Sequence, residues 1–392
     1  MTILKLGFFI HHQGAGHIRR CEAIIRHLRN CEIAIFCAAP DKLSVADLAH
    51  VTVHAIPDMI GKPSQGSHFM QSQATPEALH CVPLGVPEMR ETMGAIADWM
   101  RKSDPHLLFI DVSAEIALLA RILGVPAVKT RMHGSRNDPG HSAAYQACAG
   151  LLAPYDEKLE QDDYPVEFRE KTHYTGGFST STLVFPTKAE ARKKLKLDPD
   201  QEIIVVLSGA GGMGAHYASL TLGARAFPNA QWLVVGPTYK EGHETDFANL
   251  IEMGWVKNPA DYLAAADVII SSAGDNTVHE VLQLGKPYLC FPEWRYFDEQ
   301  TCKGAVLARQ GAAVVPDAWP GDLETWQKVL VKAKTLSPDR QLPLHNPDAD
   351  YDAAEYLTGL ACKLWGVATP ENYLDGKLTT QAVTTKVKNS VA

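Results

Sequence analysis

The chain has 392 residues, of which 46% are hydrophobic and 21% charged, and its formal net charge at pH 7 is −8. These fractions are typical of a soluble globular protein, and the acidic balance provides no basic footprint for a nucleic-acid partner. The length exceeds what one hydrophobic core usually supports, so two domains are expected.

Cysteine usage and the first apolar run indicate the compartment. The 8 cysteines are scattered without CxxC pairs, which predicts reduced thiols and a cytoplasmic protein. The apolar run 3–10 is too short to cross a bilayer and leads into a His/Gly turn, so we interpret it as a first strand. No integral membrane segment is expected, whereas peripheral contact with the inner face of the membrane stays open.

Short apolar runs alternate with helical patterns along the chain. The runs of the first half are LKLGFFI, EIAIFCA, HLLFIDV and PAVKT, and those of the second half are EIIVVLSG, QWLVVG, DVIIS, PYLCFP and AAVVP. Strands that alternate with helices form parallel sheets covered on both faces. The sequence therefore predicts an α/β fold with two doubly wound parallel-sheet domains.

Composition shifts set the predicted domain limits. We expect a first domain over 1–176 and a second over 177–345, because GGFSTSTLVFPT gives way to the charged stretch KAEARKKLKLDPDQ near the break. Residues 346–370 are predicted to form a C-terminal helix that could return to the first domain. The polar, repetitive residues 371–392 are predicted to be a flexible tail.

The first strand runs into the turn HHQGAGHIRRC. Gly14 and Gly16 suit a tight turn, but Arg19 stands where a dinucleotide fingerprint needs a small third residue. His17 is predicted in the first turn of the next helix, at the sheet edge where open α/β folds bind ligands. A histidine that only packs there is the alternative.

Asp111 ends the strand HLLFIDV and is predicted at the same carboxyl edge. A carboxylate there could orient an imidazole that acts as a general base, so His17 and Asp111 form a candidate catalytic dyad. Aspartate also caps helices, and a capping role for the helix Ser113 to Leu123 is an equal alternative.

Two loops of the second half follow strands and precede helices. The loop SGAGGMG, 208–214, can cradle phosphate with backbone N–H groups but lacks the Walker lysine. The loop SAGDNT, 272–277, is a second predicted anion site at a helix N-terminus. Thr277 and Glu280 have the spacing of a capping box, and the stretch 298–300 alone predicts a polar loop.

Taken together, these motifs resemble the GT-B glycosyltransferases, especially the UDP-glycosyltransferase superfamily and the MurG-like enzymes with a family 28-like C-terminal domain. The similarity spans most of the chain and is strongest over 255–300 and 11–20. It implies two Rossmann-like domains facing a cleft, of which the N-terminal domain binds the acceptor and the C-terminal domain binds the nucleotide-sugar donor. It also implies an inverting enzyme that requires no cofactor and no metal.

The resemblance also implies individual roles. His17 matches the general base and Asp111 the carboxylate that orients it. The implied donor-binding residues are Gly209, Gly211, Gly212, Trp255, Val256, Asn258, Ser272, Gly274, Asn276, Thr277, Glu280, Glu299 and Gln300.

Within this donor set, Trp255 would stack on the nucleobase and Glu280 would bind the ribose. The loop 272–277 and the glycine-rich loop would hold the diphosphate, and Glu299 and Gln300 would bind the sugar. The acceptor-binding residues predicted at the first-domain edge are His12, Gly16, Arg20, Arg131 and His133. Their positive charge would suit an acidic or phosphorylated acceptor, although solvated surface side chains are an equal reading.

The chain departs from the plant donor signature at four positions, which leaves the donor sugar open. Ser272 replaces a histidine, Asn258 replaces a glutamine, Glu299 replaces an aspartate, and Lys303 stands where an asparagine is usual. The one nominal DxD match, 348–350, lies far beyond the donor residues, and we interpret it as surface.

The predicted function is transfer of a sugar from a UDP-linked donor to the hydroxyl of a glycan, a lipid-linked molecule or a small molecule. A second reading is a UDP-sugar hydrolase, because residues 16–21 are also similar to the Gly-His-x-x-Arg-Cys turn of the hydrolase of pseudaminic acid synthesis. A third is a non-catalytic nucleotide-sugar-binding protein, against which the presence of both His17 and Asp111 argues.

Overall fold

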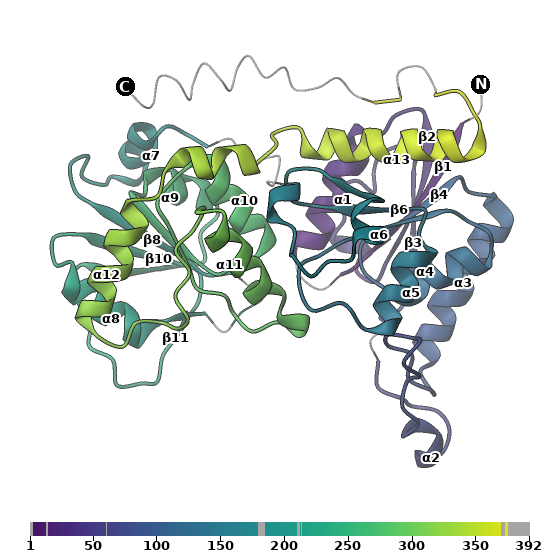
Figure 1. Ribbon diagram of the computed structural model, residues 1–392, viewed down its shortest axis with the longest axis horizontal. Coiled ribbons are helices and arrows are strands. Elements are labelled where there is room, and N and C mark those ends of the chain that lie inside the picture. Colours follow the sequence, from purple (N-terminus) through teal and green to yellow (C-terminus); the bar gives the residue numbers. More distant parts are fainter. Residues whose placement is uncertain are drawn as a thin grey trace. The chain divides into compact units, whose positions relative to one another are not determined.

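Figure 1 shows the computed structural model of the protein, which describes residues 3–12, 15–59, 61–178, 185–209, 212, 214–369 and 373–374. The chain divides into two compact units. The first unit comprises Met1–Pro154, Asp162–Gly176 and Asp348–Lys377, and the second comprises Tyr155–Gln161, Gly177–Pro347 and Leu378–Ala392.

The first unit contains a seven-stranded, fully parallel sheet in the order β3-β2-β1-β4-β5-β6-β7. The strands are β1 Leu4–Ile10, β2 Cys31–Cys37, β3 Val51–Ala55, β4 Leu107–Ile110, β5 Ala127–Thr130, β6 Gly150–Ala153 and β7 Thr172–Tyr174. The strand order reverses between β1 and β4, and such a switch point is where open α/β sheets bind ligands at the carboxyl edge.

Helices cover both faces of this sheet, as continuous apolar strands require. They include α1 Ala15–His27, α3 Pro87–Ser103, α4 Ala114–Ile122, α5 Pro139–Ala147, α6 Val166–Arg169 and α13 Ala349–Trp365, whereas the short helix α2 His68–Gln71 has no buried residue and lies away from the sheet (Figure 1). Helix α1 is amphipathic, because Ile18, Cys21 and Ile25 are buried while Arg19 is exposed.

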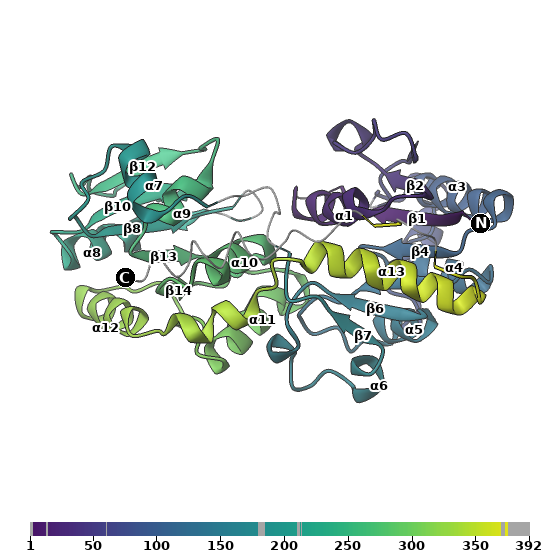
Figure 2. The ribbon, with the colours of Figure 1, turned by 90° about the horizontal axis from the view of Figure 1, so that it is seen from above.

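The C-terminal helix α13 belongs to the first unit, where it packs against α1 (Figure 2). His27 Nε2 lies 3.2 Å from Asp350 Oδ2, and His173 Nε2 lies 3.0 Å from Asp352 Oδ2. The interpretation of 348–350 as surface is wrong for Asp350, which is 6% exposed because it pairs with α1.

The second unit contains a five-stranded parallel sheet in the order β12-β10-β8-β13-β14. The strands are β8 Ile203–Leu207, β10 Gln231–Val235, β12 Leu250–Gly254, β13 Val268–Ser271 and β14 Tyr288–Cys290, with β9 Ala215–His216 and β11 Thr238–Tyr239 as a separate pair. The helices are α7 Lys188–Leu195, α8 Tyr217–Ala226, α9 Pro259–Ala265, α10 Asp275–Leu284, α11 Glu299–Arg309 and α12 Leu323–Lys334. The strand expected at AAVVP forms only a single bridge, between Val314 and Leu289.

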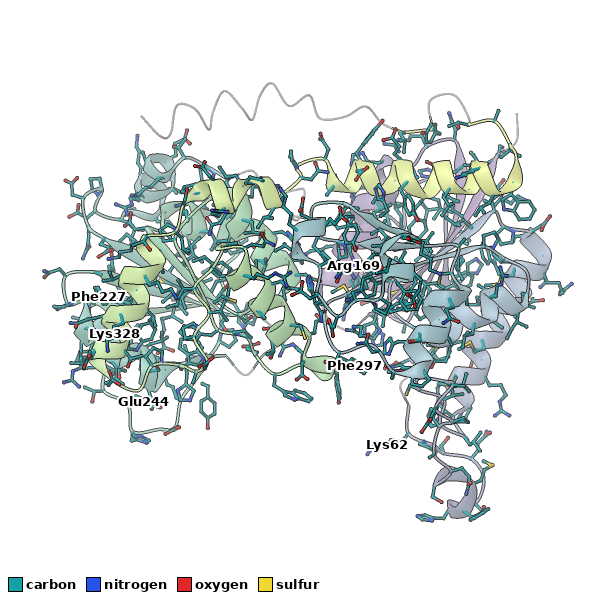
Figure 3. The ribbon with its side chains drawn as sticks, in the orientation of Figure 1. Lys62, Arg169, Phe227, Glu244, Phe297 and Lys328 are labelled. Carbon is teal, nitrogen blue, oxygen red and sulfur yellow. The ribbon has the colours of Figure 1, made fainter. Side chains whose placement is uncertain are left out.

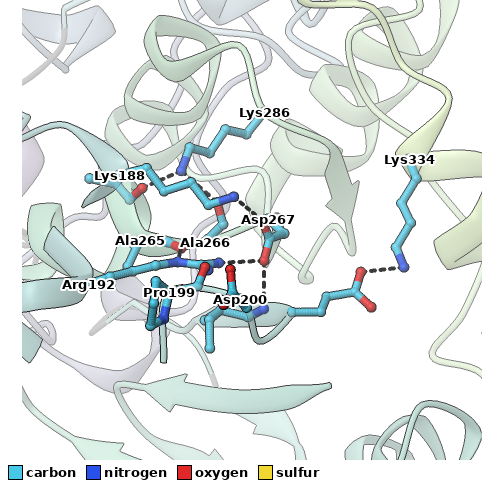
Figure 4. A network of polar contacts seen from close by, with 12 residues as sticks. Lys188, Arg192, Pro199, Asp200, Ala265, Ala266, Asp267, Lys286 and Lys334 are labelled. Atoms are coloured by element: carbon cyan, nitrogen blue, oxygen red, sulfur yellow. Dashed lines mark hydrogen bonds and ion pairs between the residues drawn. The ribbon is translucent and has the colours of Figure 1, made fainter. Parts of the chain in front are cut away.

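A polar network at the amino edge of this second sheet anchors α7 (Figure 4). Asp267, directly before β13, accepts hydrogen bonds from Arg192 Nη2 at 2.6 Å and from the Ile203 amide at 2.7 Å. Lys286 Nζ donates to Ala266 O at 2.6 Å. Burial lowers the pKa of Lys286 to about 7. This edge is opposite the carboxyl edge, so the network has a structural role.

Within the described part of the chain, no helix is both long enough and apolar enough to cross a bilayer.

Candidate functional site

Two neighbouring strands of the first sheet bring His17 and Asp111 to one edge. Strand β1 pairs in parallel with β4, with Phe9 opposite Ile110, so both strands end at the carboxyl edge. Asp111 directly follows β4, and α1 begins at Ala15, which places His17 in its first turn. The side chains meet although they are 94 positions apart in the chain.

The histidine and the carboxylate are in direct contact. His17 Nδ1 lies 2.7 Å from Asp111 Oδ2, the His17 side chain is 28% exposed, and Asp111 is fully buried. The alternative that Asp111 caps α4 is wrong, because Ser113 is the N-cap and its side chain accepts from the Ile116 amide. When the proton of a neutral His17 is on Nδ1, facing this buried carboxylate, Nε2 is the proton acceptor.

Arg20 completes this cluster. It lies three residues after His17, on the same face of α1, and is 5% exposed. Its Nη2 donates to Asp111 Oδ1 and lies 3.2 Å from His17 Nδ1. Burial alone would raise the pKa of Asp111, but His17 and Arg20 hold it well below its usual value. Asp111 is therefore ionised at neutral pH and can stabilise an imidazolium beside it.

Two further histidines surround His17. The His11 ring packs edge-on against His17 with ring centroids 5.1 Å apart. Burial, reinforced by the neighbouring His17, lowers the pKa of His11 to about 4, so His11 is neutral at physiological pH. His12 Nε2 lies 3.3 Å from Asp58 Oδ2. Gly16, predicted to contact the acceptor, is half-buried in the first turn of α1.

Arg131 and His133 follow β5 at the same sheet edge but point into the unit. Arg131 is 2% exposed and His133 is fully buried. The Arg131 guanidinium lies 3.9 Å from the centroid of the Tyr164 ring, a stacked cation-π contact. Their predicted contact with an acceptor remains a prediction, whereas the packing of Arg131 on Tyr164 gives it a structural role.

One group among the described residues has the spacing of a metal site: His80, Asp138 and His141, whose ligand atoms lie within 4.8 Å of one another. His141 Nδ1 lies 2.5 Å from Asp138 Oδ2, and its Nε2 lies 3.4 Å from Arg136 Nη1. A neutral His141 that donates from Nδ1 and accepts at Nε2 satisfies both contacts. Asp138 also N-caps α5, so the geometry fits a hydrogen-bonded cap better than a cation site.

The carboxyl edge of the second sheet carries the predicted donor residues. In the glycine-rich loop Gly209 is exposed, and Gly211 lies outside the described residues. A Cβ on Gly212 would lie 2.1 Å from Glu293 Oε2, so the missing side chain lets this carboxylate approach the loop. The short strand β9 separates the loop from α8, a feature that the sequence did not indicate.

The second predicted anion loop leads directly into α10. Gly274 is the N-cap and, as a glycine, provides no side-chain cap to the first turn. Ser272, Asn276 and Thr277 are half-buried around this helix start. The predicted capping box is wrong, because Thr277 already lies inside α10 and Glu280, 6% exposed, packs within the helix. The N-terminal amides of α10 therefore remain available to an anion.

Helix α11 holds the loop that precedes α10 through the side chain of Gln300. Gln300 is 3% exposed, and its Oε1 accepts from the Ala273 amide at 3.0 Å and from the Glu293 amide at 2.9 Å. This oxygen thus ties the loop before α10 to the loop after β14. Glu299, the first residue of α11, is half-buried. The predicted sugar contact of Gln300 remains a prediction beside this observed role in positioning the two loops.

Exposed aromatic side chains lie beside these loops in the sequence. Trp255 directly follows β12 and is 69% exposed, so its ring is open to stacking. Trp294 and Tyr296 are also strongly exposed. Phe297, labelled in Figure 3, and Asp298 both have left-handed backbone conformations, with φ of 63° and 53°. Two consecutive residues of this kind store strain, which clusters at functional loops.

The remaining donor residues lie at the start of α9. Asn258 occupies the N-cap position, and its Nδ2 donates to Asp261 Oδ2 at 3.0 Å. Val256 is half-buried between Trp255 and this cap.

Comparisons with known proteins match part of the second unit to a known domain family and the fold to a solved structure. The glycosyltransferase family 28 C-terminal domain matches residues 229–334, which include Trp255, α10 and α11. The structure of Acinetobacter baumannii MurG is similar with a TM-score of 0.62 and 14% identity, covering 91% of this chain and 100% of that one. The chain has the GT-B glycosyltransferase fold. The predicted fold class and the resemblance to MurG-like GT-B proteins are therefore confirmed.

Curated relatives of this GT-B protein are UDP-N-acetylglucosamine–N-acetylmuramyl-(pentapeptide) pyrophosphoryl-undecaprenol N-acetylglucosamine transferases. That of Gloeobacter violaceus is 29% identical over 217 residues, which are 52% of this chain and 57% of the relative. That of Clostridioides difficile is 20% identical over 215 residues, which are 52% of this chain and 51% of the relative. The matches thus span about half the length of these relatives.

Proposed function

We propose that the protein is an inverting glycosyltransferase that moves a sugar from a UDP-linked donor to an acceptor hydroxyl, with His17 as general base. The observation that carries this proposal is the contact between His17 and the buried, charged Asp111 at the ligand-binding edge of the first sheet. The family 28 domain match and the relatives, which are named as UDP-N-acetylglucosamine-dependent transferases, support it.

The proposed base step uses the tautomer of His17 with its proton on Nδ1, which lies 2.7 Å from Asp111 Oδ2. Asp111 accepts the Nδ1 proton of His17, and Nε2 takes the proton of the acceptor hydroxyl as the oxygen attacks the anomeric carbon. Arg20 keeps Asp111 ionised, so the carboxylate stabilises the imidazolium that forms. A single displacement of this kind inverts the anomeric configuration.

The proposed leaving-group step uses the second unit. The developing charge on the nucleoside diphosphate would be stabilised by the uncapped amides of α10 and by the backbone of the glycine-rich loop. Trp255 would stack on the base and Glu280 would bind the ribose. In this proposal backbone dipoles stabilise the leaving group, so the reaction needs no cofactor or metal.

A UDP-sugar hydrolase is the second candidate function. The contact of Arg20 with Asp111 supports this candidate. Residues 16–21 match the Gly-His-x-x-Arg-Cys turn, and the structure places the matched arginine on the same carboxylate as the histidine. The same base could then activate water instead of an acceptor hydroxyl.

One assay tests the proposal and separates the two candidates. The purified protein is incubated with UDP-sugars in the presence and absence of glycan, lipid-linked and small-molecule acceptors, and UDP release is measured. A transferase releases UDP at least tenfold faster with its acceptor. Release at one rate regardless of acceptor indicates the hydrolase, and no release from any donor contradicts both.

A further inference from the structure

A buried ion pair lies at the start of α10. Asp275 is the first residue of this helix, and Lys303 reaches it from α11. The Lys303 Nζ atom pairs with Asp275 Oδ1, and the side chains are only 2% and 15% exposed. The pair therefore lies in the same helix turn whose uncapped amides carry the proposed diphosphate site.

The two charges have opposite effects on an anion at this helix end. A carboxylate in the first turn stabilises the helix by itself, but it repels any diphosphate that approaches the same amides. A buried ammonium is unfavourable without a counter-charge, and Asp275 supplies it. The attraction that α10 exerts on an anion thus depends on the balance of this pair and not on the backbone alone.

Helix α11 positions both Lys303 and the loop that precedes α10. Gln300 and Lys303 are three residues apart on α11 and share one face. Gln300 binds the Ala273 amide just before α10, while Lys303 binds the first residue of α10. Any shift of α11 would move the hydrogen bond and the cation together.

We propose that Lys303 and Asp275 form a charge-balancing pair that sets the affinity of the α10 N-terminus for the donor diphosphate, with Lys303 as a positioning residue. This inference rests on the proposed function, because it assumes that the nucleotide binds at α10. It gives a physical reason for a lysine where the resembling enzymes carry an asparagine. In this proposal Lys303 neutralises Asp275, so that the carboxylate does not repel the diphosphate from the N-terminus of α10.

Variants that remove one charge at a time test the pair. Calorimetry measures the binding of uridine, UMP and UDP to the full-length protein and to Lys303→Met, Asp275→Asn and the double variant. Lys303→Met should weaken UDP binding roughly tenfold or more, UMP binding less, and uridine binding not at all, because the repulsion grows with ligand charge. Asp275→Asn should leave UDP binding equal or tighter.

The controls separate electrostatics from folding. Lys286→Met removes another buried lysine of the same unit, which donates to Ala266 O at the opposite sheet edge, and should leave UDP affinity unchanged. The double variant loses both charges, so its thermal midpoint should recover towards wild type and its UDP affinity should lie between those of the single variants.

Three outcomes would overturn the inference. Equal weakening of uridine, UMP and UDP by Lys303→Met would mean that the lysine has only a structural role. Weakening of UDP by both single variants to the same extent would exclude charge balance. If the wild-type protein binds uridine but neither UMP nor UDP, the diphosphate site is absent and the pair has no such role. If it binds none of the three, the proposed function itself is contradicted.

Discussion

The cluster around Asp111 makes a quantitative prediction for Arg20→Met. The substitution keeps the length of the buried side chain but removes the cation that holds Asp111 ionised. Asp111 is fully buried and Arg20 is 5% exposed, so solvent cannot replace the lost partner. Removing one member of a buried ion pair costs about 3–5 kcal/mol of unfolding free energy. The loss of this cation should also raise the pKa of Asp111.

The sign of the pH dependence follows from the lowered pKa of Asp111. The unfolded carboxyl titrates near pH 4, so the stability that its ionisation contributes is complete above that pH and is lost as the pH falls towards the folded pKa. Arg20→Met should lose stability at pH 7 and show a weaker acid-dependent loss below pH 4.

Urea unfolding at pH 7 and pH 3 measures both effects. Arg19→Met is the matched control, because Arg19 is the adjacent residue of α1 and is exposed. It should change stability by less than about 0.5 kcal/mol. Adding Asp111→Asn to Arg20→Met should recover part of the loss. If Arg20→Met and Arg19→Met unfold at the same urea concentration, the buried pair does not hold Asp111 as inferred.

Three further predictions test other parts of the structure. Gly94→Ala lies inside α3 with open space around the added Cβ, so it should stabilise the protein by about 0.5–1 kcal/mol in urea unfolding. Gly223→Ala in α8 would place its Cβ 2.6 Å from the Trp232 ring and should destabilise the protein by about 1–3 kcal/mol. A gain of stability at both positions would contradict this packing. The pKa of Lys286 is about 7 in the folded protein and higher in the unfolded chain, so the unfolding free energy should rise from pH 7 to pH 10. This rise should disappear in Lys286→Met. An unchanged dependence of the unfolding free energy on pH would show that another group titrates. Trp255→Ala should weaken UDP binding by roughly 1–3 kcal/mol in calorimetry without lowering the thermal midpoint, since the ring is 69% exposed, and unchanged UDP affinity would remove Trp255 from the donor site.

The sequence predicted the elements that carry strong periodic signals. The alternation of apolar runs and helices predicted parallel sheets, and the order of motifs predicted the GT-B fold, which the structural comparison confirms. The strands β3, β6 and β7 were not predicted: β3 and β7, VTVHA and THY, are interrupted by polar residues, and β6, GLLA, has only two large apolar side chains. The capping-box prediction failed because local spacing does not locate the helix start: the N-cap is Gly274, three residues before Thr277.

The site was predictable only in part, because its partners come from distant segments. His17 and Asp111 were both named from the sequence, yet their contact depends on β1 lying next to β4, which no local pattern fixes. Arg20 was assigned to the acceptor because it was expected with other basic residues at the first-domain edge, with a solvated surface position as the alternative. Its spacing of three residues from His17 was the available signal for a shared partner. From the sequence, Lys303 was recognised only as a departure from the asparagine of the plant donor signature. Its ion pair with Asp275 is seen only in the folded chain.

The central claim is that His17, oriented by Asp111, removes the acceptor proton. The most direct test is the single-turnover rate of sugar transfer in wild type and His17→Ala, with UDP affinity measured on the same samples. The account predicts a loss of at least about a hundredfold in rate with UDP affinity unchanged, the range expected when a general base is removed. A His17→Ala protein that transfers sugar at close to the wild-type rate would contradict it.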